Sequence, residues 1–286
     1  MSFSVPDDGV DPRIEQTYEA IAKARGDDPE EVVTELRNRE ASYGSMAKLY
    51  YLESTLWRVY KSAQPELGGR TPHAQLVAWS WITQTFRQAH TVFGLVSNGF
   101  PDCAFANARC AMEHGIYLSL MAGIEDVDFV LDRLEHRYIQ TGQKLSAAAP
   151  KDQVPEFLGA LLEDVGDLCA TPNPESDWVR WMGKICERLE NGDAIYSYYL
   201  GVSAYMHAGF GSASGSMCAA MGEELMEPVP SHEPAVYDKK LELWLSLGAC
   251  GWAGWSADRL FGTEHFTPAC NLLKPLGFVP LVVNLP

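Results

Sequence analysis

Residues 73–98, HAQLVAWSWITQTFRQAHTVFGLVSN, decide the fold because they form one long and mostly apolar stretch without a proline. This length, with apolar residues at helical spacing, predicts a long buried helix rather than strands. The segment NGFPD that follows, residues 98–102, breaks the chain. Pro101 suits the first turn of a second apolar helix, which we expect to reach about Gly123.

Helical periodicity also dominates the rest of the chain, with further helices expected at 12–26, 29–64, 126–147, 152–169, 178–190, 194–206 and 235–261. The sequence contains no convincing strand pair, no hairpin dipeptide and no internal repeat. It therefore predicts an all-α fold, a single large helical bundle of about eight to ten helices with an extended C-terminal tail. We expect one domain over residues 1–286, with 1–28 and 263–286 as peripheral segments.

The composition excludes several classes of partner. Hydrophobic residues make up 47% of the 286, which is enough for a sizeable core, and the net charge is −16. Such an acidic surface repels phosphate backbones, so we expect no DNA partner, and the charge argues against RNA and against anionic membranes. The first residues show no signal-peptide pattern, and the seven cysteines include no C-x-x-C pair. These features are typical of an acidic cytoplasmic protein without a membrane partner.

A charged pair stands in the middle of the second apolar helix. Arg109 and Glu113 are four residues apart, so they lie about 40° from each other around the helix and share a face. His114 lies about 140° from Arg109 and points elsewhere. Because an unpaired buried charge is costly, the pair is either a clip between helices or one wall of a polar site.

A second polar series follows in YSYYLGVSAYMH, residues 196–207. Tyr199, Ser203 and His207 recur every four residues, so their hydroxyl and imidazole groups line one helix face. One interpretation is a hydrogen-bonded histidine in the core. The other is an acid–base His207 in a pocket, oriented by Ser203 or Tyr199.

No motif identifies a metal or a cofactor. The di-iron pattern Glu-x-x-His, the P-loop, the dinucleotide fingerprint and the G-x-S-x-G elbow are all missing from the sequence. Adjacent Glu-His pairs such as Glu113-His114 do not face one another on a helix. We therefore predict no metal site, and the sequence leaves the cofactor unknown.

The order of these features resembles a broad group of bacterial all-helical proteins of unassigned function, similar in pattern to abortive-infection-type and HEPN-like proteins. The similarity covers about residues 75–260, through Arg-x3-Glu, then the Arg-Tyr pair Arg137-Tyr138, then Tyr-x3-Ser-x3-His. HEPN ribonucleases carry an arginine followed a few residues later by a histidine, and they cut RNA without metal. RCAMEH, residues 109–114, fits that motif, so the resemblance implies that His114 assists proton transfer while Arg109 contacts the phosphate.

Three functions remain open. The favoured hypothesis is a small-molecule enzyme whose buried polar site sets Arg109 and Glu113 opposite Ser203 and His207. Aromatic walls would suit a partly apolar substrate. In it Glu113, His207 and Arg109 are the candidate catalytic residues; the candidate substrate-binding residues are Tyr199, Ser203, Arg137 and Tyr138. The alternatives are the metal-independent ribonuclease and a non-catalytic interaction protein. The long apolar helices also leave a homodimer open.

Overall fold

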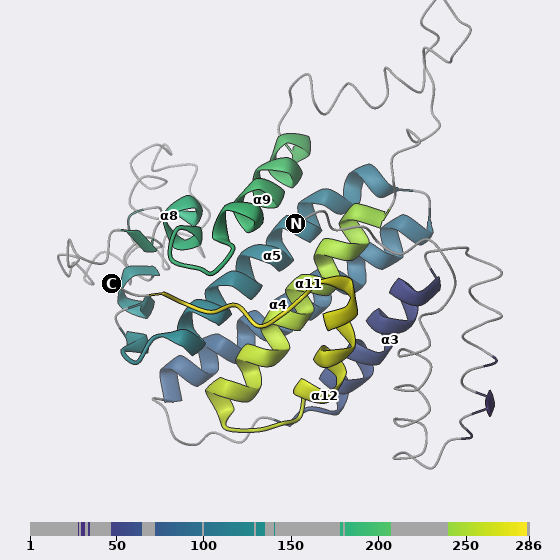
Figure 1. Cartoon of the computed structure of the whole chain (residues 1–286), viewed down its shortest axis with the longest axis horizontal. Coiled ribbons are helices and arrows are strands. Elements are labelled where there is room, and N and C mark those ends of the chain that lie inside the picture. The colour runs from purple at the N-terminus through teal and green to yellow at the C-terminus, as the bar shows by residue number, and fades with distance from the viewer. Residues whose placement is uncertain are drawn as a thin grey trace, which may run out of the picture. The chain divides into compact units, whose positions relative to one another are not determined.

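A computed structural model shows helices and no strand among the residues that it describes, which are 28, 30–31, 34, 47–64, 72–98, 100–128, 130–134, 140, 178–179, 181–206 and 240–284 (Figure 1). The helices are α3 (Ala47–Ser62), α4 (Pro72–Ser97), α5 (Pro101–Gly123), α8 (Met182–Cys186), α9 (Gly192–Met206), α11 (Lys240–Phe261) and α12 (Thr267–Cys270), followed by the 3₁₀ helix η3 (Asn271–Leu276). The all-α prediction is confirmed.

The two helices that decide the fold are placed as the sequence predicts. α4 begins and ends one residue before the expected range, and α5 begins at Pro101 and ends at Gly123. The helix expected over 178–190 is shorter, because only Met182–Cys186 is α-helical and a turn follows. Residues 127–128 and 130–134 are helical within the expected 126–147, whereas 12–26 and 152–169 lie outside the described residues.

The chain groups into two compact units, which are described separately. The first comprises Met1–Ser119 and Ser197–Leu281, and the second comprises Leu120–Tyr196 and Val282–Pro286. The expectation of one domain over the whole chain stays a prediction.

Helix α11 is the centre of the first unit. It packs against α3, α4, α12 and η3, and every residue from 242 to 258 is buried. A helix that is covered on all sides needs apolar residues around its whole circumference, and Lys240–Phe261 has them. Figure 1 shows α11 running beside α4.

Small residues let α5 approach α11 closely. A Cβ atom on Gly115 would stand 3.0 Å from the carbonyl oxygen of Ala249, so only glycine fits this crossing without a shift of backbone. One turn later, the hydroxyl oxygens of Ser119 and Ser256 lie 3.1 Å apart and satisfy each other in the core. The crossing fixes the α5 backbone at Gly115, two residues after Glu113.

The structure corrects the first part of the predicted C-terminal tail. Instead of running extended at the periphery, residues 267–276 are helical, and Phe266, Cys270, Leu273 and Phe278 are buried. The Asp258 carboxylate holds the turn between α11 and α12 by accepting backbone N–H hydrogen bonds from residues 265, 266 and 267 at 2.6–3.1 Å. Only the residues after Gly277, at φ 89°, are extended.

In the second unit, the end of α8 meets the start of α9 without room for a side chain. A Cβ atom on Gly192 would overlap the carbonyl oxygen of Cys186. The turn between the two helices also pairs with the tail, because the Glu190 N–H donates to the Val282 carbonyl at 2.9 Å. This part of the second unit therefore sets where α9 begins.

Candidate functional site

Arg109 and Glu113 form an ion pair along one face of α5. The Arg109 Nε–H donates to Glu113 Oε1 at 3.0 Å, as the four-residue spacing predicts. Both side chains are partly exposed, with 22% of the Arg109 side chain and 31% of the Glu113 side chain accessible to solvent. The pair is therefore neither deeply buried nor fully solvated.

Tyr199 of α9 completes a hydrogen-bonded triangle with this pair. The Arg109 Nη2–H donates to the Tyr199 hydroxyl oxygen at 2.8 Å, and that hydroxyl donates to Glu113 Oε1 at 2.8 Å. The Arg109 guanidinium carbon also lies 5.0 Å from the centre of the Tyr199 ring, within the range of a cation–π contact. We call these three residues the polar triangle.

The protonation states of the polar triangle follow from its contacts. Burial raises the pKa of Tyr199, and the hydrogen bond to the Glu113 carboxylate raises it further, so the phenol stays neutral and acts as a donor. Burial lowers the pKa of Arg109, but the Glu113 charge and the hydrogen bonds outweigh this and raise it overall. Arg109 is thus always cationic.

One carboxylate oxygen of Glu113 takes no part in the hydrogen bonds of the polar triangle. Glu113 Oε1 accepts both hydrogen bonds, whereas Glu113 Oε2 accepts none from the residues that the structure describes. A carboxylate oxygen can accept up to two hydrogen bonds, and 31% of the Glu113 side chain is exposed, so Oε2 can accept one from another molecule. The arrangement can bind a donor group without any rearrangement of the three side chains.

Ser203 does not reach into the polar triangle. Its hydroxyl donates to the Tyr199 carbonyl at 2.6 Å, one turn back on the same helix. The other predicted site residues, His207, Arg137 and Tyr138, lie outside the described residues. Of the predicted site residues, the structure therefore brings Arg109, Glu113 and Tyr199 together.

His114 faces a different helix from Arg109, in keeping with its predicted angle around α5. Its ring lies over Trp81 of α4, with ring centres 6.4 Å apart and planes inclined by 28°. Its buried Nδ1 has no hydrogen-bond partner among the described residues, and burial lowers the pKa of the imidazole. His114 is accordingly neutral at pH 7 and turned away from the polar triangle.

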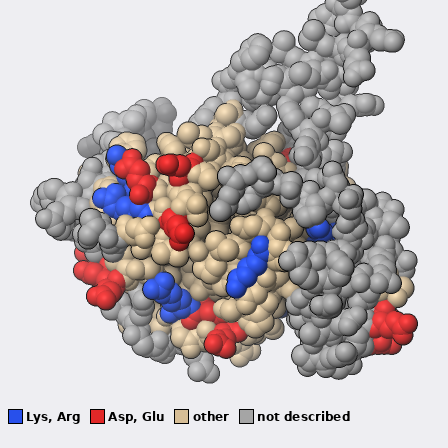
Figure 2. Space-filling model, in the orientation of Figure 1, with Lys and Arg blue, Asp and Glu red and all other residues tan. Residues whose placement is uncertain are grey.

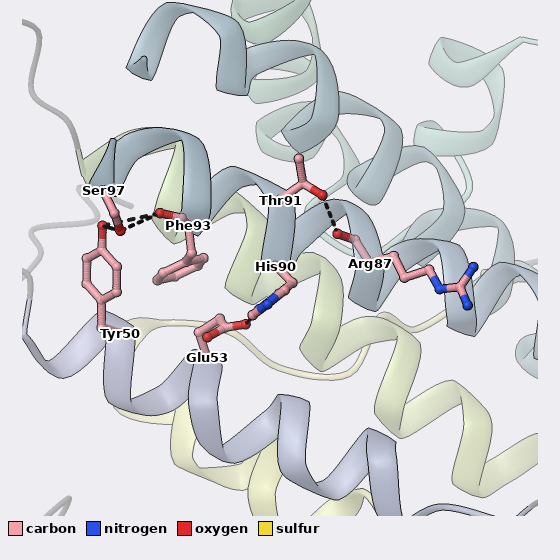
Figure 3. Close-up of polar contacts among 7 residues, drawn as sticks. All are labelled: Tyr50, Glu53, Arg87, His90, Thr91, Phe93 and Ser97. Atoms are coloured by element: carbon pink, nitrogen blue, oxygen red, sulfur yellow. Dashed lines mark hydrogen bonds and ion pairs between the residues drawn. The ribbon is translucent and has the colours of Figure 1, made fainter. Parts of the chain in front are cut away.

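The structure shows a second polar pair that the sequence did not indicate. The Glu53 carboxylate of α3 accepts a hydrogen bond from Nδ1 of His90 on α4, at 2.7 Å (Figure 3). The two residues are 37 apart in sequence and lie on different helices, so they share no helical spacing. No local spacing could have revealed the pair; the one signal was a histidine inside the long apolar stretch.

Neither a metal centre nor a membrane span is found in the described part of the chain. No group of three or more His, Cys, Asp or Glu side chains there is placed to hold a metal ion. None of the described helices combines the length and the apolar composition needed to cross a membrane.

Comparison with protein-family models, curated proteins and solved structures finds no match. The resemblance to HEPN-like proteins therefore stays a prediction.

Proposed function

We propose that this protein binds a small molecule at the polar triangle, and that the molecule presents a hydrogen-bond donor, such as an ammonium, amide or hydroxyl group, to Glu113 Oε2. The observation that carries the proposal is the unequal use of the two carboxylate oxygens. Oε1 accepts from both Arg109 and Tyr199, while Oε2 accepts no hydrogen bond from any described residue and belongs to a side chain that is 31% exposed.

Preorganisation supports binding at this position. Two residues from two helices fix the Glu113 side chain before any ligand arrives, so a ligand does not have to order it. The Arg109 charge already balances the Glu113 charge, which makes a net anionic ligand group a poor match. This changes the role expected for Arg109, which orients the carboxylate instead of contacting an anionic substrate.

We also propose that the protein carries out acid–base chemistry on the bound molecule. Tyr199 is a neutral phenol and Arg109 a permanent cation, so neither takes a proton at pH 7. Glu113 and His207 are therefore the proposed acid–base residues, and His207 follows the end of α9 by one residue. Ser203, Arg137 and Tyr138 remain proposed substrate-binding residues.

No observation on the described residues favours the ribonuclease alternative. Arg109 is engaged by Glu113 and Tyr199, while His114 lies over Trp81 on the other side of α5. On the face shown in Figure 2, the described Lys and Arg side chains stand among Asp and Glu side chains and form no single-sign patch. A phosphate backbone would find no continuous basic surface there.

A fragment screen tests the proposal. Ligand-observed NMR is run with three small-molecule sets, namely amines, alcohols or amides, and carboxylic acids, against the native protein and Glu113→Gln. The control is Glu187→Gln, which breaks the exposed ion pair at 2.8 Å between Glu187, just after α8, and Lys184 on α8, and leaves the polar triangle intact.

We expect donor-bearing fragments to bind the native protein and Glu187→Gln, and to lose binding to Glu113→Gln. A hit list dominated by carboxylic acids would contradict the proposal. So would donor-bearing hits that bind Glu113→Gln as well as the native protein. In either case the polar triangle is a clip between α5 and α9.

A further inference from the structure

The Glu53–His90 pair has the geometry of an oriented, reactive imidazole. Glu53 is buried, with 8% of the residue exposed, whereas 54% of the His90 side chain is accessible to solvent. The buried carboxylate lies at the Nδ1 edge of the ring, and the ring itself is exposed to solvent. Figure 3 shows Glu53 rising from α3 toward the His90 ring on α4.

Two contacts fix the ring of His90. The hydrogen bond from Nδ1 to the Glu53 carboxylate requires the proton on Nδ1, so in the neutral ring Nε2 carries the lone pair. The ring also stacks on Trp57, with centres 4.3 Å apart and planes inclined by only 7°. Nε2 has no hydrogen-bond partner among the described residues. A nucleophilic nitrogen is therefore held in one tautomer and one ring plane at the surface.

His90 partly offsets the cost of burying the Glu53 carboxylate. Burial raises the pKa of Glu53, and the hydrogen bond and charge of His90 oppose that rise. A carboxylate with little access to water is stabilised most by a cationic partner, as in the Asp–His pair of hydrolases. A His90 ring that becomes cationic during a reaction therefore keeps this carboxylate at its Nδ1 edge.

The two helices that carry this pair, α3 and α4, are basic in a chain that is acidic overall. Apart from Glu53, helices α3 and α4 contain no Asp or Glu. They carry three exposed cations, which make no ion pair with any described carboxylate: Arg58, Lys61 and Arg87. Arg87 precedes His90 by three residues, and the Lys61 amine lies 5.9 Å from the Trp57 ring centre. A negatively charged molecule is favoured here.

We propose that Glu53 and His90 form a second site, separate from the polar triangle, at which His90 hydrolyses activated carboxylic esters that carry a negative charge. His90 Nε2 adds to the ester carbonyl carbon, and the bond from that carbon to the alcohol oxygen breaks, so the alcohol leaves as its anion with the electron pair. The acylated ring is cationic and keeps its Nδ1–H bond to Glu53.

Water completes the reaction. It adds to the same carbon, the bond from carbon to Nε2 breaks, and the electron pair returns to the ring. Both protons of the water pass to solvent, and the acyl group leaves as a carboxylate. No metal, cofactor or redox partner takes part. His90 is the catalytic residue, and Glu53 acts through it as a positioning residue.

The test uses mono-4-nitrophenyl glutarate, an anionic ester, and 4-nitrophenyl acetate, a neutral one. Steady-state release of 4-nitrophenolate is measured after the initial burst for the full chain, for His90→Gln and for His73→Gln. His73 is the matched control, since it is exposed on the same helix. All seven cysteines are kept in each protein, so acylation of thiols is the same in each.

We expect His90→Gln to lose the steady-state release that His73→Gln retains, and we expect the native protein to prefer the anionic ester. Arg87→Gln should reduce that preference without abolishing turnover of the neutral ester. Equal release from His90→Gln and His73→Gln would overturn the proposal. Its failure would leave the proposed function untouched, because no residue is shared.

A second measurement separates a positioning role for Glu53 from a structural one. NMR of the ¹⁵N-labelled imidazole reports the tautomer of His90, and we expect the proton on Nδ1. Glu53→Gln keeps a hydrogen-bond acceptor, so it should keep this tautomer while slowing turnover through the lost charge. A proton on Nε2 in the native protein, or unchanged turnover in Glu53→Gln, would contradict the assignment.

Discussion

Replacing Tyr199 by phenylalanine removes one oxygen atom from the polar triangle and leaves its ring in place. That oxygen accepts a hydrogen bond from Arg109 and donates one to Glu113, both at 2.8 Å. The Arg109–Glu113 pair keeps its own hydrogen bond at 3.0 Å. The substitution therefore isolates the contribution of the α9 side chain to the triangle.

The expected loss of stability follows from these two hydrogen bonds. A hydrogen bond to a charged group contributes about 1.5–3 kcal/mol when it is well shielded. Here both partners are partly exposed, and water can replace the hydroxyl on each of them. We therefore expect Tyr199→Phe to lower the free energy of unfolding by about 1–2 kcal/mol, or roughly 2–6 °C in Tm for a chain of this size.

Thermal unfolding followed by circular dichroism at neutral pH measures this difference. Tyr60→Phe is the control, because the Tyr60 ring stacks on Phe86 at 5.0 Å and its hydroxyl makes no hydrogen bond with the described residues. We expect little change in its Tm. If Tyr199→Phe and Tyr60→Phe lower Tm equally, the triangle contributes nothing to stability and the reasoning from its distances fails.

Two further predictions concern α9 and α5. On α9, Gly192→Ala should lower Tm, because its Cβ would overlap the Cys186 carbonyl oxygen. Gly201→Ala should raise Tm through the higher helix propensity of alanine, since no neighbouring atom lies within 4 Å of its Cβ. A higher Tm for Gly192→Ala than for Gly201→Ala in thermal unfolding would contradict this. On α5, the lowered pKa of His114 means that its contribution is present above its ordinary pKa of 6.5 and is lost as pH falls, so His114→Gln should lose less stability than the native protein between about pH 8 and about pH 5.5. Equal losses in urea titrations at the two pH values would refute it.

The sequence predicted the parts of the fold that depend on local pattern. The apolar stretch 73–98 and the proline at 101 were enough to place α4 and α5, because helix periodicity and helix-start residues act over a few residues. The prediction of an extended C-terminal tail was wrong because it also relied on local pattern alone. The tail's prolines look like breakers locally, yet Pro275 lies inside η3, whose Leu273 is buried. The segment before α12 is held by Asp258, which accepts backbone N–H hydrogen bonds from residues 265–267.

The candidate site divides in the same way. The Arg109–Glu113 contact was predictable because both residues lie on one helix at a fixed spacing. That Tyr199 joins them, and Ser203 does not, depends on which turn of α9 lies opposite the pair, because the two residues share one face of α9 and stand one turn apart along it. The phenol reaches the pair, whereas the serine hydroxyl bonds to the backbone of its own helix. The Glu53–His90 pair required the packing of α3 on α4, which no local pattern specifies.

Partial exposure is what distinguishes a binding site from a clip in this cluster. A clip is most effective when both partners are satisfied and shielded, as Ser119 and Ser256 are in the core. In the polar triangle, both donors bond to one oxygen of Glu113, the other oxygen accepts no hydrogen bond from a described residue, and 31% of the side chain is exposed. A double-mutant cycle of Glu113→Gln and Tyr199→Phe measures their coupling in stability, and the fragment screen measures the use of the remaining oxygen. Strong coupling with no donor-selective binding would identify a clip, whereas donor-selective binding that depends on Glu113 would identify a site that the same coupling holds ready.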